Sequence, residues 1–258
     1  MRDLTGGERS SAARQAAATL AALRAKALRI HCITNPIAMS FTANVLLALG
    51  VTPTMSSAPS EMSDFVTASD VLCINLGTLS TDRCEAIDIA IDHALQQQKP
   101  WVLDPVLIDV SAGRRTYALS LLTRKPAVVR GNRTEIAALA DVDQHATLAL
   151  AARSGGIVAQ TGYEDIVTDG YRVARVTNGH PMMASITAMG CASAAVVAAS
   201  LAGHADALTA TISALVIIGV AGELAGRDAT GPGSFQVSLL DRLYDLDPDT
   251  LQHTAKIT

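Results

Sequence analysis

Short aliphatic runs alternate along the chain with longer segments in which apolar residues recur at helical spacing. The short runs predict strands over residues 29–34, 52–55, 71–76, 101–103, 127–130 and 157–160. The longer segments predict helices over residues 12–27, 41–49, 81–98 and from Asn132 to about Leu139. Strands that alternate with helices are typical of one α/β domain, here 1–258, with a mostly parallel central sheet covered by helices.

The C-terminal half departs from this alternation. Asp169-Gly170 stands between two short apolar runs and predicts a β-hairpin. The apolar stretch 207–225 is interrupted by small and polar residues, so we expect a buried core helix rather than a membrane span. After Cys191 we expect two or three helices, then a loop at 231–235 (GPGSF) and a final helix.

Composition and charge exclude several classes of function. Apolar residues make up 49% of the chain and aromatic residues only 3%, so the core is aliphatic. The net charge of −4, without a long basic run, argues against nucleic-acid binding. The cysteines show no C-x-x-C spacing, and residues 1–29 carry charges throughout instead of an apolar signal segment. We therefore expect a cytoplasmic protein with no nucleic-acid or membrane partner.

Small or polar residues lie at the predicted C-terminal ends of successive strands. They are Gly77-Thr78, Asp104, Arg130-Gly131-Asn132, Thr161-Gly162 and Gly190-Cys191. In open α/β sheets, ligands bind outside the carboxyl ends of the strands. The sequence therefore predicts that these residues line one crevice.

Gly190 and Cys191 belong to the segment 186–203, which reads as a strand end followed directly by an alanine-rich helix. A helix N-terminus attracts anions through its unpaired N–H groups and its dipole, and a cysteine there tends towards thiolate. The segment therefore indicates a site for a negatively charged group. A buried structural cysteine is the alternative, and cysteine-hydrolase chemistry stays open. No Walker motif and no G-x-G-x-x-G after a strand occurs, which excludes ordinary P-loop and Rossmann sites.

The other polar residues each allow a functional and a structural interpretation. Asp104 directly precedes a proline and suits either a hydrated Mg²⁺ or a turn. Asn132 and Glu135 have the spacing of a capping box, although Glu135 could also lie near phosphate and metal-bound water. Arg130 could bind phosphate oxygens or a surface carboxylate, and Thr161 could contact a nucleotide or form a turn.

Taken together, these motifs resemble those of the hydroxyethylthiazole kinase family. The blocks HCITNPIAMSFTANVLLALGVTPTM, INLGTLS, WVLDPV, KPAVVRGNRTEI, VTDG, NGHPMM, MGC and GPGSF follow the family's order over residues 29–240. The resemblance implies a ribokinase-like three-layer α/β sandwich. It also implies transfer of the γ-phosphoryl group of MgATP to the primary hydroxyl of 4-methyl-5-(2-hydroxyethyl)thiazole, a salvage step towards thiamine. Homotrimers with sites at subunit interfaces are a further implication.

The resemblance assigns nucleotide and metal contacts by position. Arg130 and Thr161 are expected to contact ATP, and Gly190 to help hold the transferring phosphate at the helix N-terminus. Asp104 and Glu135 are expected to organise Mg²⁺ and its waters. Because phosphoryl transfer has a loose transition state, such positioning and charge stabilisation contribute most of the rate.

The resemblance also assigns the alcohol site. Met55, Ala188 and Asn35 are expected to border the thiazole, and Cys191 stands where related sugar kinases place a proton-accepting aspartate. The family usually reads G-[TA]-G-C where this chain has Ala188-Met189 before its Gly-Cys pair, and alanine is strained if that position requires a positive φ. Two alternatives follow: a kinase for another small heterocyclic alcohol, or a homologue that binds these ligands without turnover.

Overall fold

Strands and helices alternate up to β7, two further strands follow it directly, and the described residues after Val176 are mainly helical. The strands are β1 (Arg2–Asp3), β2 (Arg29–Ile33), β3 (Thr52–Thr54), β4 (Val71–Asn75), β5 (Trp101–Asp104), β6 (Val128–Asn132), β7 (Ile157–Thr161), β8 (Asp165–Thr168) and β9 (Arg172–Val176). The α-helices are α1 (Gly6–Ala25), α2 (Met39–Ala48), α3 (Met62–Thr67), α4 (Thr81–Gln96), α5 (Ala112–Leu122), α6 (Arg133–Ala140), α7 (Ala146–Ser154), α8 (Met189–Leu201), α9 (Ala207–Asp228), α10 (Pro232–Asp245) and α11 (Pro248–Thr254). Short 3₁₀ helices are η1 (Pro59–Glu61) and η2 (Pro181–Ser185).

Within the described residues, the strands form one nine-stranded sheet in the order β1-β9-β8-β7-β6-β5-β4-β2-β3. Neighbouring strands are parallel except at β8, which is antiparallel to β7 and β9. The predicted hairpin at Asp169-Gly170 is confirmed as the connection between β8 and β9. This computed structural model describes residues 2–202, 204 and 206–258, so Gly203, the last residue of the predicted segment 186–203, lies outside the described residues.

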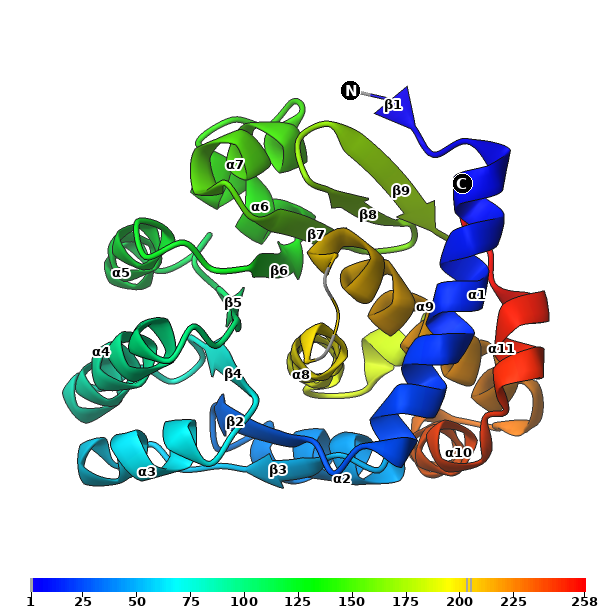
Figure 1. Cartoon of the computed structure of the whole chain (residues 1–258), viewed down its shortest axis with the longest axis horizontal. Coiled ribbons are helices and arrows are strands. Elements are labelled where there is room, and N and C mark those ends of the chain that lie inside the picture. The colour runs from blue at the N-terminus through cyan, green and yellow to red at the C-terminus, as the bar shows by residue number, and fades with distance from the viewer. Residues whose placement is uncertain (1, 203, 205) are drawn as a thin grey trace.

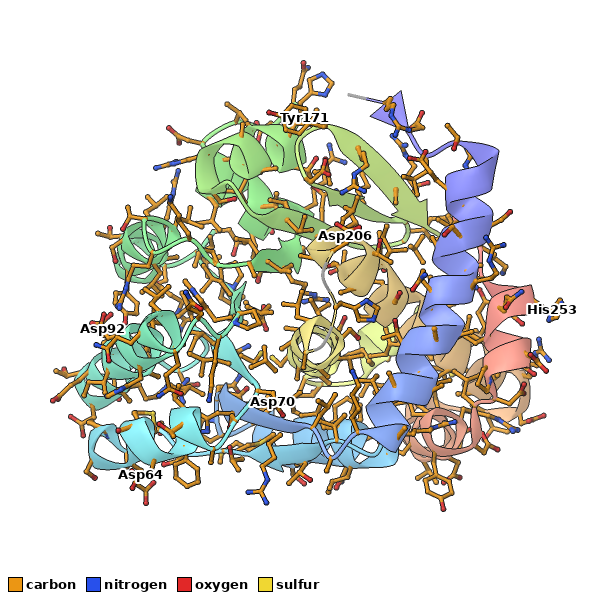
Figure 2. All side chains as sticks on the ribbon, viewed as in Figure 1. Asp64, Asp70, Asp92, Tyr171, Asp206 and His253 are labelled. Atoms are coloured by element: carbon orange, nitrogen blue, oxygen red, sulfur yellow. The ribbon has the colours of Figure 1, made fainter. Side chains whose placement is uncertain are left out.

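Helices cover both faces of the sheet and complete a three-layer α/β sandwich (Figure 1). Helices α3 to α7 cover one face, where aliphatic side chains such as Ile87 and Leu121 meet the sheet residues Ile74 and Leu103. Helices α8 and α9 pack on the other face, where α2 lies beside α8 and against β3, and α1, α10 and α11 lie outside α8 and α9. Exposed charged side chains such as Asp92 project outward from the helices (Figure 2). The predicted fold class is confirmed.

Helix α9 corresponds to the apolar stretch predicted over 207–225. By length and composition it could cross a membrane, but 78% of its most apolar window is buried inside the fold. It packs against α1, α8 and α10, and apolar residues such as Leu215 and Ile217 belong to the larger core cluster. The interpretation as a core helix is therefore confirmed.

Two local predictions in the C-terminal half were wrong. No strand leads into Cys191 in the described part of the chain: η2 is followed by a turn at Ala188, and α8 begins at Met189. The GPGSF block is not a loop, because Gly231 is the N-cap of α10 and Pro232 its first residue. Proline suits this position, since its fixed φ matches the first turn and its missing N–H would have no helical partner.

Candidate active site

A cleft of about 1300 Å³ opens at the carboxyl ends of β5, β6 and β7, facing the N-terminus of α8. Asp104, Arg130, Thr161 and Cys191 all line it. The prediction of one shared crevice is therefore confirmed at these four sites and wrong at the fifth, because Gly77-Thr78 after β4 is not among the lining residues. The origin of Cys191 also differs from the prediction. Asp104, Arg130 and Thr161 come from strands, whereas Cys191 comes from the first turn of α8.

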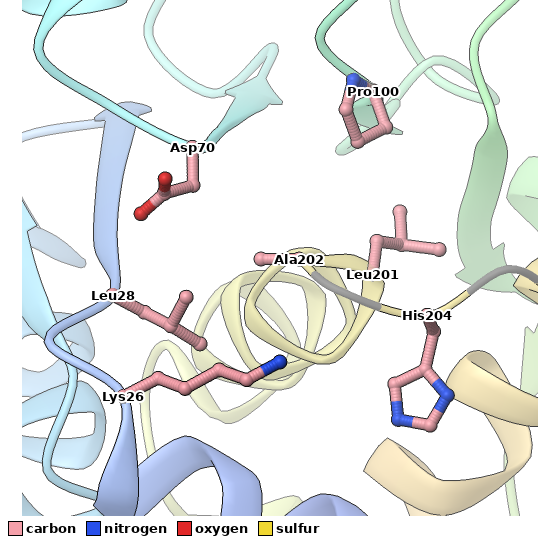
Figure 3. A pocket seen from close by; sticks show the side chains of 7 residues that line it. All are labelled: Lys26, Leu28, Asp70, Pro100, Leu201, Ala202 and His204. Carbon is pink, nitrogen blue, oxygen red and sulfur yellow. The ribbon is translucent and has the colours of Figure 1, made fainter.

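A smaller pocket of about 410 Å³ lies at the opposite, amino ends of the strands (Figure 3). There Leu28, Asp70 and Pro100 directly precede β2, β4 and β5, and Lys26 and His204 lie beside them. Its described lining residues include none of the predicted site residues. The candidate active site is therefore the cleft at the carboxyl edge.

Asp104 is the last residue of β5, and its side chain is buried. Asn75 Nδ2 donates to its Oδ2 at 2.6 Å, while Oδ1 has no hydrogen-bond partner within the described part of the chain. Burial raises the pKa of Asp104 to about 7, and the charge of Glu135 adds to this, against the opposing effects of Arg130 and the Asn75 bond. A carboxylate that titrates near neutral pH in a cleft is typical of a functional group.

The oxygen chemistry of Asp104 fits the Mg²⁺ that the family resemblance implies. Among the residues that the structure describes, no three His, Cys, Asp or Glu side chains gather into a cage for a metal ion. Asp104 Oδ1 is nevertheless a buried carboxylate oxygen without a partner. One protein carboxylate suits an ion that takes most of its ligands from phosphate oxygens and water.

Asn75 is a site residue that the sequence analysis missed. It ends β4, is buried, and donates from Nδ2 to Cys191 Sγ at 3.2 Å as well as to Asp104. Its Oδ1 accepts from Asn35 Nδ2 at 3.0 Å. Asn35 therefore reaches the site through Asn75 and through its own longer bond to Cys191 Sγ (3.7 Å), although it does not line the cleft. The sequence feature that could have identified Asn75 is a polar residue at the end of an otherwise apolar strand.

The prediction that Cys191 tends towards thiolate was wrong. Its pKa is raised to about 12, first by burial and then by the negative charge of Asp104. Hydrogen bonds from Asn75 and Asn35 and the charge of Arg130 lower the pKa, but burial outweighs them. The thiol is therefore protonated at neutral pH, because burial and a neighbouring carboxylate dominate over the helix dipole.

Arg130 lies against the first turn of α8. A Cβ built on Gly190 would lie 2.8 Å from Arg130 Nη1, so a side chain at this position would require the guanidinium to move away from α8. Arg130 Nε is buried and unpaired within the described residues. Helix N-termini leave N–H groups unpaired, so a guanidinium and amide donors converge here on one side of the cleft. The arrangement suits a phosphate group.

Glu135 forms the predicted capping box with Asn132. Asn132 Oδ1 accepts from the Glu135 N–H at 2.9 Å, and Glu135 Oε2 accepts from the Asn132 N–H at 2.8 Å. The second oxygen, Oε1, accepts from the Leu107 N–H at 2.9 Å, which joins the loop after β5 to the start of α6. Glu135 is buried and also lines the cleft, so the capping and functional interpretations are compatible.

Thr161 ends β7, where its Oγ1 donates to the Gly131 carbonyl at 3.4 Å. The neighbouring Asp165 also lines the cleft and was missed from the sequence. Asp165 Oδ1 accepts from the Gly162 N–H at 2.9 Å. Burial raises the pKa of Asp165 to about 6, although this hydrogen bond and the charge of Arg130 oppose the shift. The sequence feature that could have identified Asp165 is an aspartate three residues after a glycine at a strand end.

Met55 and Ala188 do not lie together in the cleft of the single chain. Ala188 lines it, whereas Met55 follows the edge strand β3 and is not among the lining residues. Ala188 has φ 67° and ψ 7°, the left-handed region. The backbone at Ala188 therefore has the positive φ at which alanine is strained.

Replacing Ala188 by glycine is expected to stabilise the fold. Glycine adopts φ 67° without the Cβ penalty, so Ala188→Gly should raise the free energy of unfolding by about 1 kcal/mol. Chemical denaturation of the purified protein measures this change. Ala18→Gly, at an exposed position inside α1, is the matched control and should lower the stability by about as much. If Ala188→Gly and Ala18→Gly lowered the free energy of unfolding by the same amount, Ala188 would not be strained.

Comparisons with known proteins agree with one another over most of the chain. A model described as "Hydroxyethylthiazole kinase family" matches residues 20–249. Among curated relatives, a hydroxyethylthiazole kinase of Granulibacter bethesdensis is 44% identical and covers 92% of both chains. One from Cereibacter sphaeroides is 43% identical over 93% of this chain and 97% of its own length.

Solved structures give the same result for the fold. A hydroxyethylthiazole kinase protein from Pyrococcus horikoshii OT3 superposes with a TM-score of 0.91 at 36% identity, covering 94% of this chain and 98% of its own. A ribokinase-like superfamily protein from Enterococcus faecalis V583 reaches a TM-score of 0.68 at 14% identity, with 96% of this chain and 97% of its own covered. At that identity the second likeness concerns the fold alone.

Proposed function

The chain belongs to the hydroxyethylthiazole kinase family, and from this premise we propose how its cleft performs phosphoryl transfer. The protein is an ATP-dependent small-molecule kinase, a hydroxyethylthiazole kinase. In the proposal, the γ-phosphoryl group of MgATP passes to the primary hydroxyl of 4-methyl-5-(2-hydroxyethyl)thiazole, a salvage step towards thiamine. The observation that carries the proposal is the convergence of Arg130, the first turn of α8 and Asp104 on one cleft.

The proposed chemistry depends on positioning rather than on covalent catalysis. Arg130 and the N–H groups of Gly190 and Cys191 bind oxygens of the transferring phosphate and stabilise its charge in the loose transition state. Thr161 contacts the nucleotide from the end of β7. Asp104 and Glu135 organise Mg²⁺ and its waters. When bound, Mg²⁺ neutralises charge on the phosphate oxygens.

Cys191 contributes mainly through its main-chain N–H in this proposal. A thiol with a pKa of about 12 is a poor proton acceptor at neutral pH. In a loose transition state the attacking hydroxyl carries little charge, so loss of its proton needs no strong base. This makes the amide of Cys191 more important than its sulfur.

Replacing the sulfur should therefore leave most of the turnover. Cys191→Ser is expected to keep kcat within about tenfold of the unmodified protein, because the α8 amide donors stay in place. Steady-state ADP release measures this, with Cys84→Ser, outside the cleft lining, as the matched control. A loss of about 10²-fold or more in a folded Cys191→Ser, the size of a general-base effect, would give the thiol a catalytic role.

We further propose that the protein is a homotrimer whose thiazole site is completed at a subunit interface. Asn35, Ala188 and, at that interface, Met55 border the thiazole. Met55 directly follows edge strand β3, and apolar side chains are exposed at Ile37 (71%), just before α2, and at Leu47 (56%), within α2. A subunit interface would cover this apolar surface. A molar mass of about three times the chain mass, measured by light scattering, would support the proposal. A fully active monomer would contradict it.

A cytoplasmic location is part of the same proposal. All four cysteines are free thiols: Cys32, Cys73, Cys84 and Cys191. Free thiols are the usual state of cysteine in a reducing compartment.

The experiment that tests the function is ADP release from purified protein with MgATP and a panel of heterocyclic alcohols. Release that depends on hydroxyethylthiazole supports the proposed substrate. Release with another alcohol alone would favour the alternative kinase, for which the methyl group of Ala188 in the cleft is the specific observation. Binding of nucleotide or thiazole without ADP release would favour a ligand-binding homologue.

A further inference from the structure

Asn75 uses its whole hydrogen-bonding capacity behind the cleft. Its two Nδ2 hydrogens go to Asp104 Oδ2 (2.6 Å) and Cys191 Sγ (3.2 Å). Its Oδ1 accepts from Asn35 Nδ2 and from the Gly77 N–H, both at 3.0 Å. The residue is only 1% exposed and does not line the cleft itself. A single buried amide thus connects two residues of the cleft with the Asn35 side chain and the Gly77 backbone behind it.

The orientation of the amide is fixed by its neighbours. If Asn75 were flipped, its NH₂ group would face the N–H donors of Asn35 and Gly77, and its oxygen would face the Asp104 carboxylate. All of these contacts would be unfavourable, since each pairs like with like. Only the observed orientation satisfies four partners, so the donor groups of Asn75 necessarily point at Asp104 and Cys191.

The backbone around Asn75 is shaped to admit this network. A Cβ built on Gly77 would lie 2.7 Å from Asn35 Nδ2 and 2.9 Å from Asn75 Oδ1. A side chain at Gly77 would therefore separate the two amides. The strand end, the glycine and the second asparagine together hold the Asn75 side chain in one rotamer.

We propose that Asn75 is a positioning residue for phosphoryl transfer, which orients the Asp104 carboxylate and, through its bond to Cys191 Sγ, holds the first turn of α8 and its N–H donors in place. By occupying Asp104 Oδ2, it leaves Oδ1 as the oxygen available to the reaction. By binding Cys191 Sγ, it fixes the first turn of α8 relative to the end of β5. The inference rests on the proposed function of this cleft, because it assigns Asn75 to the residues that act there.

Two substitutions separate positioning from simple support of the fold. Asn75→Asp keeps the shape and the bonds accepted from Gly77 and Asn35, but replaces the NH₂ group by a carboxyl oxygen. The bond donated to Cys191 Sγ is lost, and the amide donor to Asp104 gives way to a second carboxyl group that either repels the Asp104 carboxylate or shares its proton. Asn75→Ala removes all four bonds. The matched control is Thr168→Val in β8 of the same sheet, outside the cleft lining. It removes two hydrogen bonds of a buried hydroxyl, one donated to the Arg172 carbonyl at 2.7 Å and one accepted from the Gly170 N–H at 3.0 Å.

If Asn75 positions the reacting groups, both Asn75 variants lose about 10²-fold in kcat, the size expected for a small misplacement of reacting groups. The KM values for ATP and thiazole change by less than about threefold, since the binding contacts remain. Thr168→Val keeps its kcat. Wild-type kcat in Asn75→Asp, which preserves the accepted bonds, would overturn the proposal and leave Asn75 a structural role.

A second readout does not require turnover. In protein labelled with ¹³C at the Asp carboxyl carbons, the Asp104 resonance is identified by its absence in Asp104→Asn. It should shift in both Asn75 variants and stay in place in Thr168→Val; an unmoved resonance in Asn75→Asp would overturn the proposal. If the unmodified protein shows no thiazole-dependent turnover, the proposed function fails, and this measurement still decides whether Asn75 orients Asp104. Thermal unfolding shows whether each variant folds. If Asn75→Ala does not fold, Asn75→Asp, which keeps the shape of the side chain, provides the test.

Discussion

Asp104→Asn is expected to lower kcat by about 10²- to 10³-fold while the fold persists, because it removes the one buried carboxylate oxygen without a partner in the described part of the cleft. The substitution keeps the shape of the side chain. The new amide oxygen can still accept the bond from Asn75, so β4 and β5 stay joined. Steady-state ADP release and thermal unfolding measure the two effects separately. Wild-type turnover in this variant would remove Asp104 from the reaction.

The pH dependence of this variant provides a second check. Because the pKa of Asp104 is raised from 3.8 to about 7, the folded chain binds this proton more tightly than the unfolded chain. Its contribution to the free energy of unfolding is therefore fully present below about pH 4 and is lost as the pH rises through about 7. Asp104→Asn should lack this change. If the carboxylate form is the active one, kcat/KM of the unmodified protein rises through the same pH range, and the variant lacks that rise.

Arg130→Ala is expected to cost about 10³-fold in kcat, the lower end of the effect of an arginine that stabilises a transferring phosphoryl group. Its guanidinium lies against Gly190 at the start of α8, where the charge of the transferring group is proposed to develop. Arg130→Lys should recover only part of the loss, because an ammonium lacks the forked donor geometry. Arg115→Lys, at an exposed ion pair with Asp141, is the matched control and should leave turnover unchanged.

Rapid-mix single-turnover kinetics locates the Arg130 effect. A slower chemical step in Arg130→Ala agrees with stabilisation of the transition state. A variant that changes only the KM for ATP would instead show that Arg130 contributes uniform binding, which would contradict the assigned role.

The sequence was informative where local pattern determines structure. Continuous aliphatic strands ending in Asp104 and Thr161 predicted both the sheet and its functional edge, since parallel strands place their carboxyl ends together. The spacing of Asn132 and Glu135 predicted a helix cap because capping depends on residues four positions apart at most. Short helices such as α3 and α7 were missed, since six to nine residues carry too little periodicity.

What the sequence missed depends on contacts between distant segments. The pKa of Cys191 is raised by burial and by Asp104, which is far away along the chain, whereas the helix N-terminus that favours thiolate is local. Asn75 gains its importance only when β4, β5 and α8 bring its partners together. The turn before α8 was taken for a strand end because β-branched Ile186 and Thr187 resemble one, whereas Ala188 adopts a left-handed conformation that local propensity disfavours.

The central claim is that this cleft phosphorylates the hydroxyl of hydroxyethylthiazole. Mass spectrometry of the thiazole after incubation with protein and ATP labelled at the γ-phosphoryl group with ¹⁸O tests it most directly. A labelled thiazole phosphate is expected, which is absent without protein and strongly reduced with Asp104→Asn. The claim would be contradicted if the thiazole received no labelled phosphoryl group in any sample, including one with a folded Ala188→Gly, Met189→Thr double variant.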